Sequence, residues 1–323
     1  MDKTEPLLSI CIPTFNRCNI LKDVLYQYLN NPEFDEEVEI IISDNASTDD
    51  TYRICQTFCR RASNIHYYRN EENIRDANFV KVLDLAKGRY LKLFNDWAYC
   101  TVESLRYIKD RIRENLVEKK PIYFSSGNIF TQYKAEVVYA RNLDEFVKVV
   151  STFVTYNNLF GVWKEQWAGV ADKGKYSTLQ LQQVDWIYQI VSQNGGCVIY
   201  DKPVFWSSNV SLGVRGGYNW FKIHLDNYYT IMCTYVKNGC ISSHTFIEDK
   251  HNLLEHFKPE FSKALFYNYD KTWNFETRGT VNLLLKYYRK DPYVIYYLAK
   301  LFLFFGFQVS KSWGARLRNY LVK

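Results

Sequence analysis

The sequence predicts an α/β fold in which a mostly parallel sheet is flanked by helices. Over residues 7–115, short apolar segments alternate with amphipathic segments in the order βαβαβαβα. This order is typical of parallel strands joined by helices. Polar clusters at residues 14–17 and 43–51 follow the first two strands. They should therefore lie together beyond the carboxyl ends of the strands, where open sheets bind their ligands.

Each predicted element has its own local signal. The strand at 7–13 is an apolar run that stops at a proline, and the strand at 38–43 is rich in β-branched residues. The helix at 19–30 carries one apolar stripe, and the helix at 101–115 opens with a capping arrangement. The other elements predicted here are helices at 48–62 and 76–86 and strands at 65–69 and 89–94.

Beyond residue 120 the pattern is less regular. The segments 122–127 and 135–140 alternate like strands, and we expect them to extend the sheet in antiparallel orientation. From residue 218 onward the pattern is mainly helical. We therefore predict a nucleotide-binding and catalytic domain of residues 1–217 and a helical region of residues 218–323. Between 140 and 218 we expect helices at 142–155 and 178–192 and a strand at 197–200.

Composition restricts the class of protein. The chain has 323 residues, 47% of them hydrophobic, so it can bury a sizeable core. The net charge of +6 is mild and the first 290 positions hold no basic tract, so we expect no nucleic-acid partner. Eight cysteines without CxxC pairs favour reduced thiols. The sequence has neither a signal peptide nor a long apolar run, so we expect a cytoplasmic location.

The segment 292–323 combines an apolar stretch with a basic one. Residues 292–307 are rich in Tyr, Leu and Phe, and four Lys or Arg residues follow them. A hydrophobic helix with basic residues beside it is typical of attachment to an anionic membrane surface. We therefore expect a peripheral protein on the inner face of the cell membrane. A C-terminal helix packed on the core is the alternative.

Three side chains at the predicted strand ends suit a nucleotide. Thr14 and Arg17 follow the first strand, and Asp44 ends the second. A carboxylate can accept a hydrogen bond from a base N–H, and an arginine can pair with phosphate. The glycine-rich dinucleotide fingerprint is absent, so we expect neither NAD nor FAD. A nucleotidyltransferase is also disfavoured, because the first turn is not Gly-rich.

The motifs at residues 12–17 (Ile-Pro-Thr-Phe-Asn-Arg), 43–49 (Ser-Asp-Asn-Ala-Ser-Thr-Asp) and 73–78 resemble glycosyltransferase family 2. This family consists of inverting nucleotide-sugar transferases with the Rossmann-like GT-A fold, and the resemblance covers residues 7–115. Within it, the chain is similar to abequosyltransferase-type enzymes. The resemblance implies transfer of a hexose or deoxyhexose from a nucleotide-diphosphate sugar to a glycan acceptor, expected to be lipid-linked, in O-antigen or capsule synthesis.

The resemblance also gives roles to residues near the strand ends. Thr14, Phe15 and Arg17 would lie against the nucleotide and its phosphates, and Asp44 would hydrogen-bond the base. The alternatives are a capping role for Asp44 and a solvated position for Arg17.

Later segments would complete the donor site. Asn73 and Asn78 would line the nucleoside side of the pocket, with Arg75 where relatives often carry glycine. Turn and helix-capping duty is the alternative for both asparagines. Arg215 lies in a glycine-bearing loop that would close over the diphosphate.

The main departure from the family follows the strand at 89–94. Relatives carry carboxylates there that hold Mg²⁺ or Mn²⁺ against the diphosphate. This chain has Trp97 and Ala98 at the corresponding positions, which leaves Asp96 as the predicted metal ligand. Three interpretations are open. Asp96 binds the ion alone or with a distant ligand, or cations neutralise the phosphates, or the protein is a catalytically degenerate nucleotide-sugar-binding or scaffold protein. The candidate cations are Arg17, Lys81 and Arg215.

Inverting transfer needs a general base that takes the proton of the acceptor hydroxyl. Relatives supply an Asp or Glu from a helix start beyond the sheet, and Asp185 is our candidate, with a surface helical aspartate as the alternative. Trp186 beside it would face a sugar ring. Asp172, in a predicted turn, is the reserve candidate, and His244 is a weaker candidate for an additional metal ligand.

Overall fold

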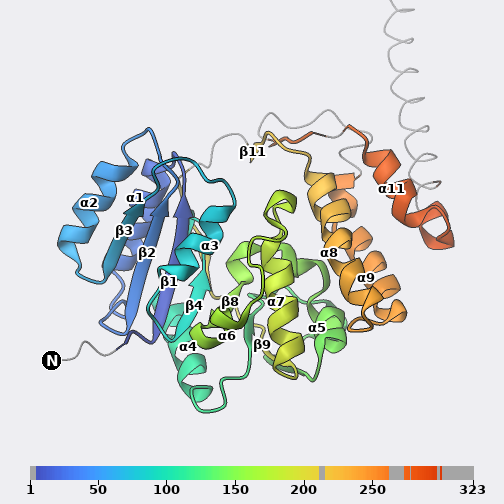
Figure 1. The fold of residues 1–323 in the computed structure, drawn as a ribbon, viewed down its shortest axis with the longest axis horizontal. Coiled ribbons are helices and arrows are strands. Elements are labelled where there is room, and N and C mark those ends of the chain that lie inside the picture. Colours follow the sequence, from blue (N-terminus) through green and yellow to red (C-terminus); the bar gives the residue numbers. More distant parts are fainter. Residues whose placement is uncertain (1–4, 211–214, 262–272, 277, 297–298, 300–323) are drawn as a thin grey trace, which may run out of the picture. The chain divides into compact units, whose positions relative to one another are not determined.

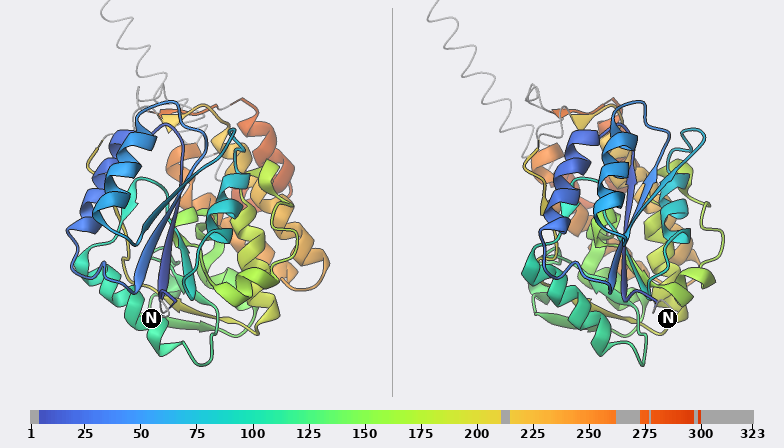
Figure 2. Two further views of the ribbon diagram at one scale, coloured as in Figure 1. Left: turned by 60° about the vertical axis from the view of Figure 1, so that its left-hand side comes forward. Right: turned by 90° about the vertical axis from the view of Figure 1, so that its left-hand side faces the viewer.

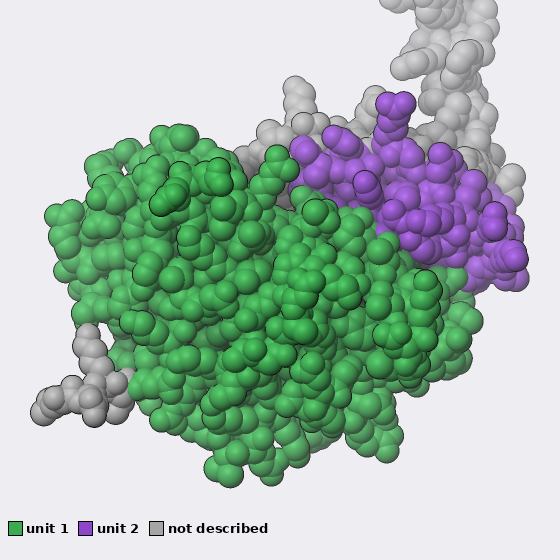
Figure 3. Space-filling model, in the orientation of Figure 1, with its two compact units in different colours: residues 1–212, 227–253 green, residues 213–226, 254–323 purple. Residues whose placement is uncertain are grey.

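The computed structural model describes residues 5–210, 215–261, 273–276, 278–296 and 299. The chain divides into two compact units, which Figure 3 distinguishes by colour. Unit 1 comprises residues 1–212 and 227–253, and unit 2 comprises residues 213–226 and 254–323. Within the described residues, no helix has both the length and the apolar character needed to cross a membrane. The predicted membrane-surface segment lies mostly outside these residues.

The central sheet of unit 1 has five strands in the order β3-β2-β1-β4-β8 (Figure 1). Four of these strands run parallel, as predicted, whereas β8 runs antiparallel to β4. The strands are β1 (Leu8–Thr14), β2 (Val38–Asp44), β3 (Ile65–Arg69), β4 (Tyr90–Leu93) and β8 (Gly161–Trp163). The strand order reverses between β1 and β4. Ligands of doubly wound sheets bind at such a switch point.

Helices cover both faces of this sheet. Figure 2 shows α1 and α2 on one face and α3 on the other. Every residue of β1 and β2 is buried, as expected for a parallel sheet covered on both sides. The predicted helices are therefore confirmed, with bounds α1 (Cys18–Leu29), α2 (Thr51–Arg61), α3 (Ala77–Asp84) and α4 (Val102–Glu114).

The later strands differ from the prediction. They form a separate three-stranded sheet in the order β6-β9-β7 and do not extend the central one. Its strands are β6 (Ile122–Phe124), β7 (Val137–Ala140) and β9 (Cys197–Tyr200). The edge of the central sheet at β4 is already paired with β8, so the later strands cannot join there. The hydroxyl of Tyr90 donates to the Ile122 carbonyl, 2.8 Å away, and links the two sheets.

The predicted helix at 142–155 is shorter than expected. It ends as α5 (Leu143–Val150), because Ser151 has a φ of +47° and a 3₁₀ segment, Ser151–Thr155, follows. The rest of unit 1 contains the 3₁₀ turn Asn157–Leu159, α6 (Lys164–Gly169), α7 (Gln182–Gln193), α8 (Tyr228–Lys237) and the strand pair β5 (Ala98–Tyr99) with β10 (Trp206–Ser207).

The region after residue 218 is mainly helical, as predicted. Its elements include a π-helix (Lys222–Asn227), α8, α9 (Ser243–His256) and α11 (Thr280–Tyr288). Unit 2 also holds a short parallel pair, β11 (Arg215–Gly216) with β12 (Trp273–Asn274).

Candidate active site

The polar clusters that follow β1 and β2 contact each other directly. Thr14 and Asp44 are register partners at the ends of these strands. The backbone N–H of Asn16 donates to Ser47 Oγ, 2.8 Å away, and Asn16 Oδ1 accepts from the Thr48 N–H at 2.7 Å. The first turn and the loop after β2 therefore form one joined structure at the carboxyl end of the sheet.

Asp96 joins this structure from the other side of the switch point. Thr14 Oγ1 donates to Asp96 Oδ2 at 2.9 Å, and Arg17 Nη1 donates to Asp96 Oδ1 at 3.0 Å. Burial raises the pKa of Asp96, while the Arg17 charge and these two hydrogen bonds act in the opposite direction. The Asp96 side chain is 7% exposed and that of Arg17 is 44% exposed, so the pair has a buried anion and an accessible cation. We call Thr14, Arg17 and Asp96 the switch-point group.

The side chains around Asp96 do not supply the oxygen ligands that a resident divalent ion needs. Both oxygens of its carboxylate already accept hydrogen bonds, one of them from a cation. At the next position, the Trp97 ring packs on Phe205 with centroids 6.2 Å apart, and Ala98 is buried in β5. Within the part of the chain that the structure describes, no three His, Cys, Asp or Glu side chains gather to hold a metal. Such an ion would have one protein carboxylate to bind.

Asp44 stabilises the loop that follows β2. Its buried carboxylate accepts from the Ser47 N–H at 3.0 Å and from the Tyr67 hydroxyl at 2.6 Å. Burial, together with Asp44, raises the pKa of Tyr67, so this hydroxyl stays protonated and remains a donor. The predicted contact of Asp44 with a base stays a prediction.

Asn73 and Asn78 brace the neighbouring loops. Asn78 is 2% exposed, accepts from Ser43 Oγ at 2.6 Å and donates to the Ser43 carbonyl at 2.8 Å. Asn73 is exposed, and its Oδ1 accepts from Asn45 Nδ2 at 2.8 Å. Arg75 has a φ of +50°, a left-handed conformation that glycine adopts without strain. Asn73 is thus the more accessible of the two asparagines, and the predicted contact of both with a nucleoside stays a prediction.

Asp185 lies in the first turn of α7 and is held from two sides. Its Oδ1 accepts from the Tyr235 hydroxyl and its Oδ2 from Gln189 Nε2, both at 2.7 Å. Burial and this carboxylate raise the pKa of Tyr235, so the hydroxyl remains a donor. Asp185 lines a hollow of about 340 Å³, and the reserve candidate Asp172, in the predicted turn, lines it too. This hollow offers room for a polar group beside a fixed carboxylate.

A direct contact connects α7 to the loop before α3. Gln182, the first residue of α7, donates through Nε2 to the Asp76 carbonyl at 2.6 Å, immediately before α3. The prediction for Trp186 is wrong. Its ring is fully buried, and its Nε1 donates to the Lys173 carbonyl at 2.9 Å, so it belongs to the core and cannot face a sugar.

The remaining predicted site residues have different surroundings. Phe15 is 42% exposed, and its backbone lies between Thr14 and the turn. Arg215 lies in β11 of unit 2, and its side chain is outside the description, so its role stays a prediction. His244 lies in the first turn of α9 and joins no metal-binding group among the described residues.

Lys92 was not predicted as a site residue, although it supports the loop that carries Asp96. It is fully buried, donates through Nζ to the carbonyls of Asn158 and Phe160, and burial lowers its pKa to about 7. Asn158 Oδ1 in turn accepts from the Asn95 N–H at 2.7 Å. A lysine in the middle of the apolar strand predicted at 89–94 was the available signal.

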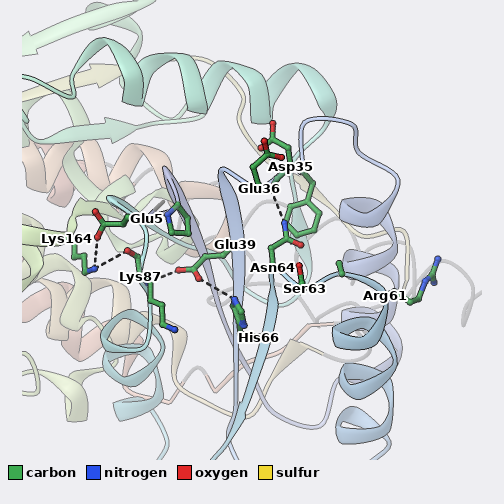
Figure 4. Close-up of a pocket in the computed structure, with 13 residues that line it drawn as sticks. Glu5, Asp35, Glu36, Glu39, Arg61, Ser63, Asn64, His66, Lys87 and Lys164 are labelled. Atoms are coloured by element: carbon green, nitrogen blue, oxygen red, sulfur yellow. Dashed lines mark hydrogen bonds and ion pairs between the residues drawn. The ribbon is translucent and has the colours of Figure 1, made fainter. Parts of the chain in front are cut away.

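A larger hollow, of about 820 Å³, lies at the opposite, amino end of the strands (Figure 4). Its buried carboxylate, Glu39, accepts from Ser9 Oγ at 2.6 Å, from the Lys87 N–H at 2.7 Å and from the Gly88 N–H at 3.1 Å. These bonds join the starts of three strands, so the role of Glu39 is structural. None of the predicted site residues lines this hollow.

Comparison with known proteins identifies a family for part of the chain. Residues 9–160 match the family model described as Glycosyl transferase family 2. These residues form a glycosyl transferase family 2 domain. The predicted resemblance is confirmed for this part of the chain.

Two curated proteins are among the relatives that the chain matches. The chain is 28% identical to abequosyltransferase RfbV of Salmonella typhimurium, over 61% of this chain and 65% of that protein. It is 33% identical to the GalNAc(5)-diNAcBac-PP-undecaprenol beta-1,3-glucosyltransferase of Campylobacter jejuni, over 28% of this chain and 29% of that protein. The chain thus matches about two thirds of the first relative's length and under a third of the second's.

Solved structures confirm the GT-A fold. The structure of Staphylococcus aureus TarS in complex with UDP has a TM-score of 0.55 at 15% identity and covers 80% of this chain and 74% of that one. The mannosyltransferase PcManGT from Pyrobaculum calidifontis, in complex with GDP-Man and Mn²⁺, has a TM-score of 0.54 at 13% identity, over 80% of this chain and 73% of that one. At these identities the likeness concerns the fold alone.

Proposed function

We propose that this protein is an inverting glycosyltransferase that moves a hexose or deoxyhexose from a nucleotide-diphosphate sugar to a glycan acceptor. The observation that carries the proposal is the switch-point group of the glycosyl transferase family 2 domain. It places an accessible arginine where ligands of such sheets bind. The arginine suits the diphosphate, and the joined loops beyond β1 and β2 suit the nucleoside.

The proposed reaction uses Asp185 as the general base. The acceptor oxygen attacks C1 of the sugar, and the bond between C1 and the diphosphate oxygen breaks on the opposite face. The bonding electron pair leaves with the nucleoside diphosphate, and the hydroxyl proton passes to Asp185. Tyr235 and Gln189 fix the carboxylate, so that its orientation is set before the acceptor arrives.

The named relatives support the place of this reaction in bacterial surface-polysaccharide synthesis, such as that of O-antigen or capsule. One relative is an abequosyltransferase, and the name of another contains an undecaprenol-linked glycan. We therefore propose a lipid-linked glycan as the acceptor. The apolar and basic sequence of residues 292–323 supports attachment to an anionic membrane surface on the cytoplasmic side.

The test is transfer by the full chain. UDP-, GDP-, CDP- and dTDP-sugars are supplied with undecaprenyl-diphosphate-linked glycans, and both transfer and release of nucleoside diphosphate are measured. Asp185→Asn should lower transfer about 100- to 10,000-fold, as expected for loss of a general base. Asp172→Asn, in the same hollow, is the matched control and should keep activity. Nucleotide-sugar binding without transfer by the unmodified protein would instead support a scaffold, which Trp97 and Ala98 make the second candidate.

A further inference from the structure

We infer that this donor site neutralises the diphosphate with the Arg17 guanidinium, in the place where the family uses a divalent metal ion. The inference rests on the proposed function, because it concerns the donor of that reaction. Three features of the described residues carry it: the ligands available to an ion, the packing of the positions after Asp96, and the orientation of Arg17.

The ligands available to an ion are too few. Mg²⁺ and Mn²⁺ favour six oxygen ligands in near-octahedral geometry, and the protein usually supplies one or two of them as carboxylates. The Asp96 carboxylate is the one acidic group of the switch-point group, and Arg17 Nη1 lies 3.0 Å from its Oδ1. A dication bound to that oxygen would lie beside a guanidinium of the same sign and would be repelled. The carboxylate is thus already paired with a cation.

The two following positions cannot supply a second carboxylate. The Trp97 ring packs on Phe205, and the backbone carbonyl of Trp97 accepts from the Ser208 N–H at 2.7 Å. Ala98 pairs with Ser207 in the β5–β10 ladder. The backbone here is fixed by strand pairing, and the side chains are apolar and face the core. Positions 97 and 98 therefore serve the packing of the core and offer no ligand for an ion.

Arg17 is oriented for an anion. One N–H of its guanidinium is fixed by Asp96, whose second oxygen is in turn fixed by Thr14. The side chain is 44% exposed and makes no other hydrogen bond to any residue within the described part of the chain. A guanidinium has five N–H donors, so four remain to meet phosphate oxygens, and pairs of parallel N–H bonds are the favoured geometry. Asp96 is therefore a positioning residue for Arg17.

This arrangement meets the need of the leaving group. When the bond between C1 and the diphosphate oxygen breaks, the electron pair stays on the diphosphate and its negative charge grows. The free N–H groups of Arg17 stabilise that charge, while the acceptor proton moves to Asp185. No ion and no further co-reactant takes part.

The experiment measures binding to the full chain by calorimetry. UDP, GDP, CDP and dTDP, with their monophosphates, are titrated after EDTA treatment and again with excess MnCl₂. We expect at least one diphosphate to bind in EDTA, with an affinity that manganese changes less than about two-fold. Arg17→Ala should weaken that diphosphate about 10- to 100-fold and the monophosphate less, because bonds to charged groups are lost. Arg17→Lys should recover part of the loss.

Two controls separate a specific effect from a general one. Arg141 is paired with Glu145 and is 84% exposed, so Arg141→Ala should leave binding unchanged. Asp96→Asn should weaken the diphosphate in EDTA, since Arg17 loses its anchor, and thermal unfolding of each variant checks that it is folded. Binding or transfer that requires manganese overturns the inference and leaves the proposed function standing. Failure of every nucleotide to bind in both buffers overturns the proposed function, and the inference with it.

Discussion

The buried Lys92, which supports the loop that carries Asp96, allows a quantitative prediction of how stability depends on pH. Burial lowers its pKa from the ordinary 10.5 to about 7. Between these two values the unfolded chain binds one more proton at this position than the folded chain does. The free energy of unfolding therefore rises with pH across this window, and the contribution is least favourable below pH 7, where both forms are charged.

The magnitude follows from the same two pKa values. Each tenfold step corresponds to about 1.4 kcal/mol, so the lowered pKa of Lys92 costs the folded protein about 4 kcal/mol at pH 7 and about 2 kcal/mol at pH 9, relative to a pH at which the amine is neutral in both states. Lys92→Met removes this cost and also removes the bonds to the Asn158 and Phe160 carbonyls, which contribute about 1 kcal/mol each. We expect the variant to be more stable by about 2 kcal/mol at pH 7 and nearly equal to the parent protein at pH 9.

The assay is urea unfolding of both proteins at the two pH values. The decisive quantity is the change in their stability difference, about 2 kcal/mol, because the lost hydrogen bonds and the titration of all other groups cancel from it. Lys81→Met is the control, since Lys81 is exposed on α3 and should give the same difference at both pH values. A stability difference that does not change with pH in Lys92→Met would refute the reasoning.

Three further changes test other parts of unit 1. Tyr235→Phe removes the 2.7 Å hydrogen bond to Asp185 and should lower kcat about 10- to 100-fold with KM unchanged. If Tyr235→Phe lowers kcat by the same factor in a protein that already carries Asp185→Asn, Tyr235 does not act by positioning Asp185. Gly88→Ala would place a Cβ 2.8 Å from a backbone nitrogen of β1 and should cost about 1–3 kcal/mol on thermal unfolding, whereas Gly169→Ala, with nothing within 4 Å, should cost nothing. Burial raises the pKa of Asp249 to about 7, so the folded state loses stability as pH rises from about 4 to 7. The free energy of unfolding of Asp249→Asn, relative to the parent, should therefore increase by about 2 kcal/mol between pH 5 and 7. A difference that shrinks over this range would contradict the reasoning.

Elements that depend on local signals could be predicted from the sequence. The helix that became α4 is one example, because Thr101 accepts from the Ser104 N–H and caps it, as its position in the chain suggests. The strand β8 could not be predicted in the same way. It has three residues, Gly161–Trp163, too few for a periodic pattern, and it exists because it pairs with β4 about seventy residues earlier.

The sequence predicted individual candidate residues of the site, but it did not predict which of their side chains contact one another. Asp185 and Trp186 are neighbours in sequence, but successive side chains leave a helix about 100° apart, so one faces the hollow and the other the core. The pairing of Arg17 with Asp96 joins residues 79 positions apart. The order of the strands in the sheet brings these two residues together. The sequence alone did not decide whether Asp96 holds a metal ion or whether cationic side chains neutralise the phosphates.

Two buried carboxylates at opposite ends of the sheet show how structural and binding roles can be distinguished. Glu39 accepts from the Ser9 hydroxyl and from two backbone N–H groups just before β4, and His66 Nε2 lies 3.5 Å from it, so its oxygens are occupied by groups of the framework itself. Asp96 is paired with Arg17, whose guanidinium remains accessible and has donors to spare. A ligand can exploit the second arrangement, since binding adds bonds to Arg17 without breaking any. At Glu39 a ligand would have to displace bonds that hold the strands together. We therefore propose the smaller, open group at the carboxyl end as the binding site, although the hollow at the amino end is larger.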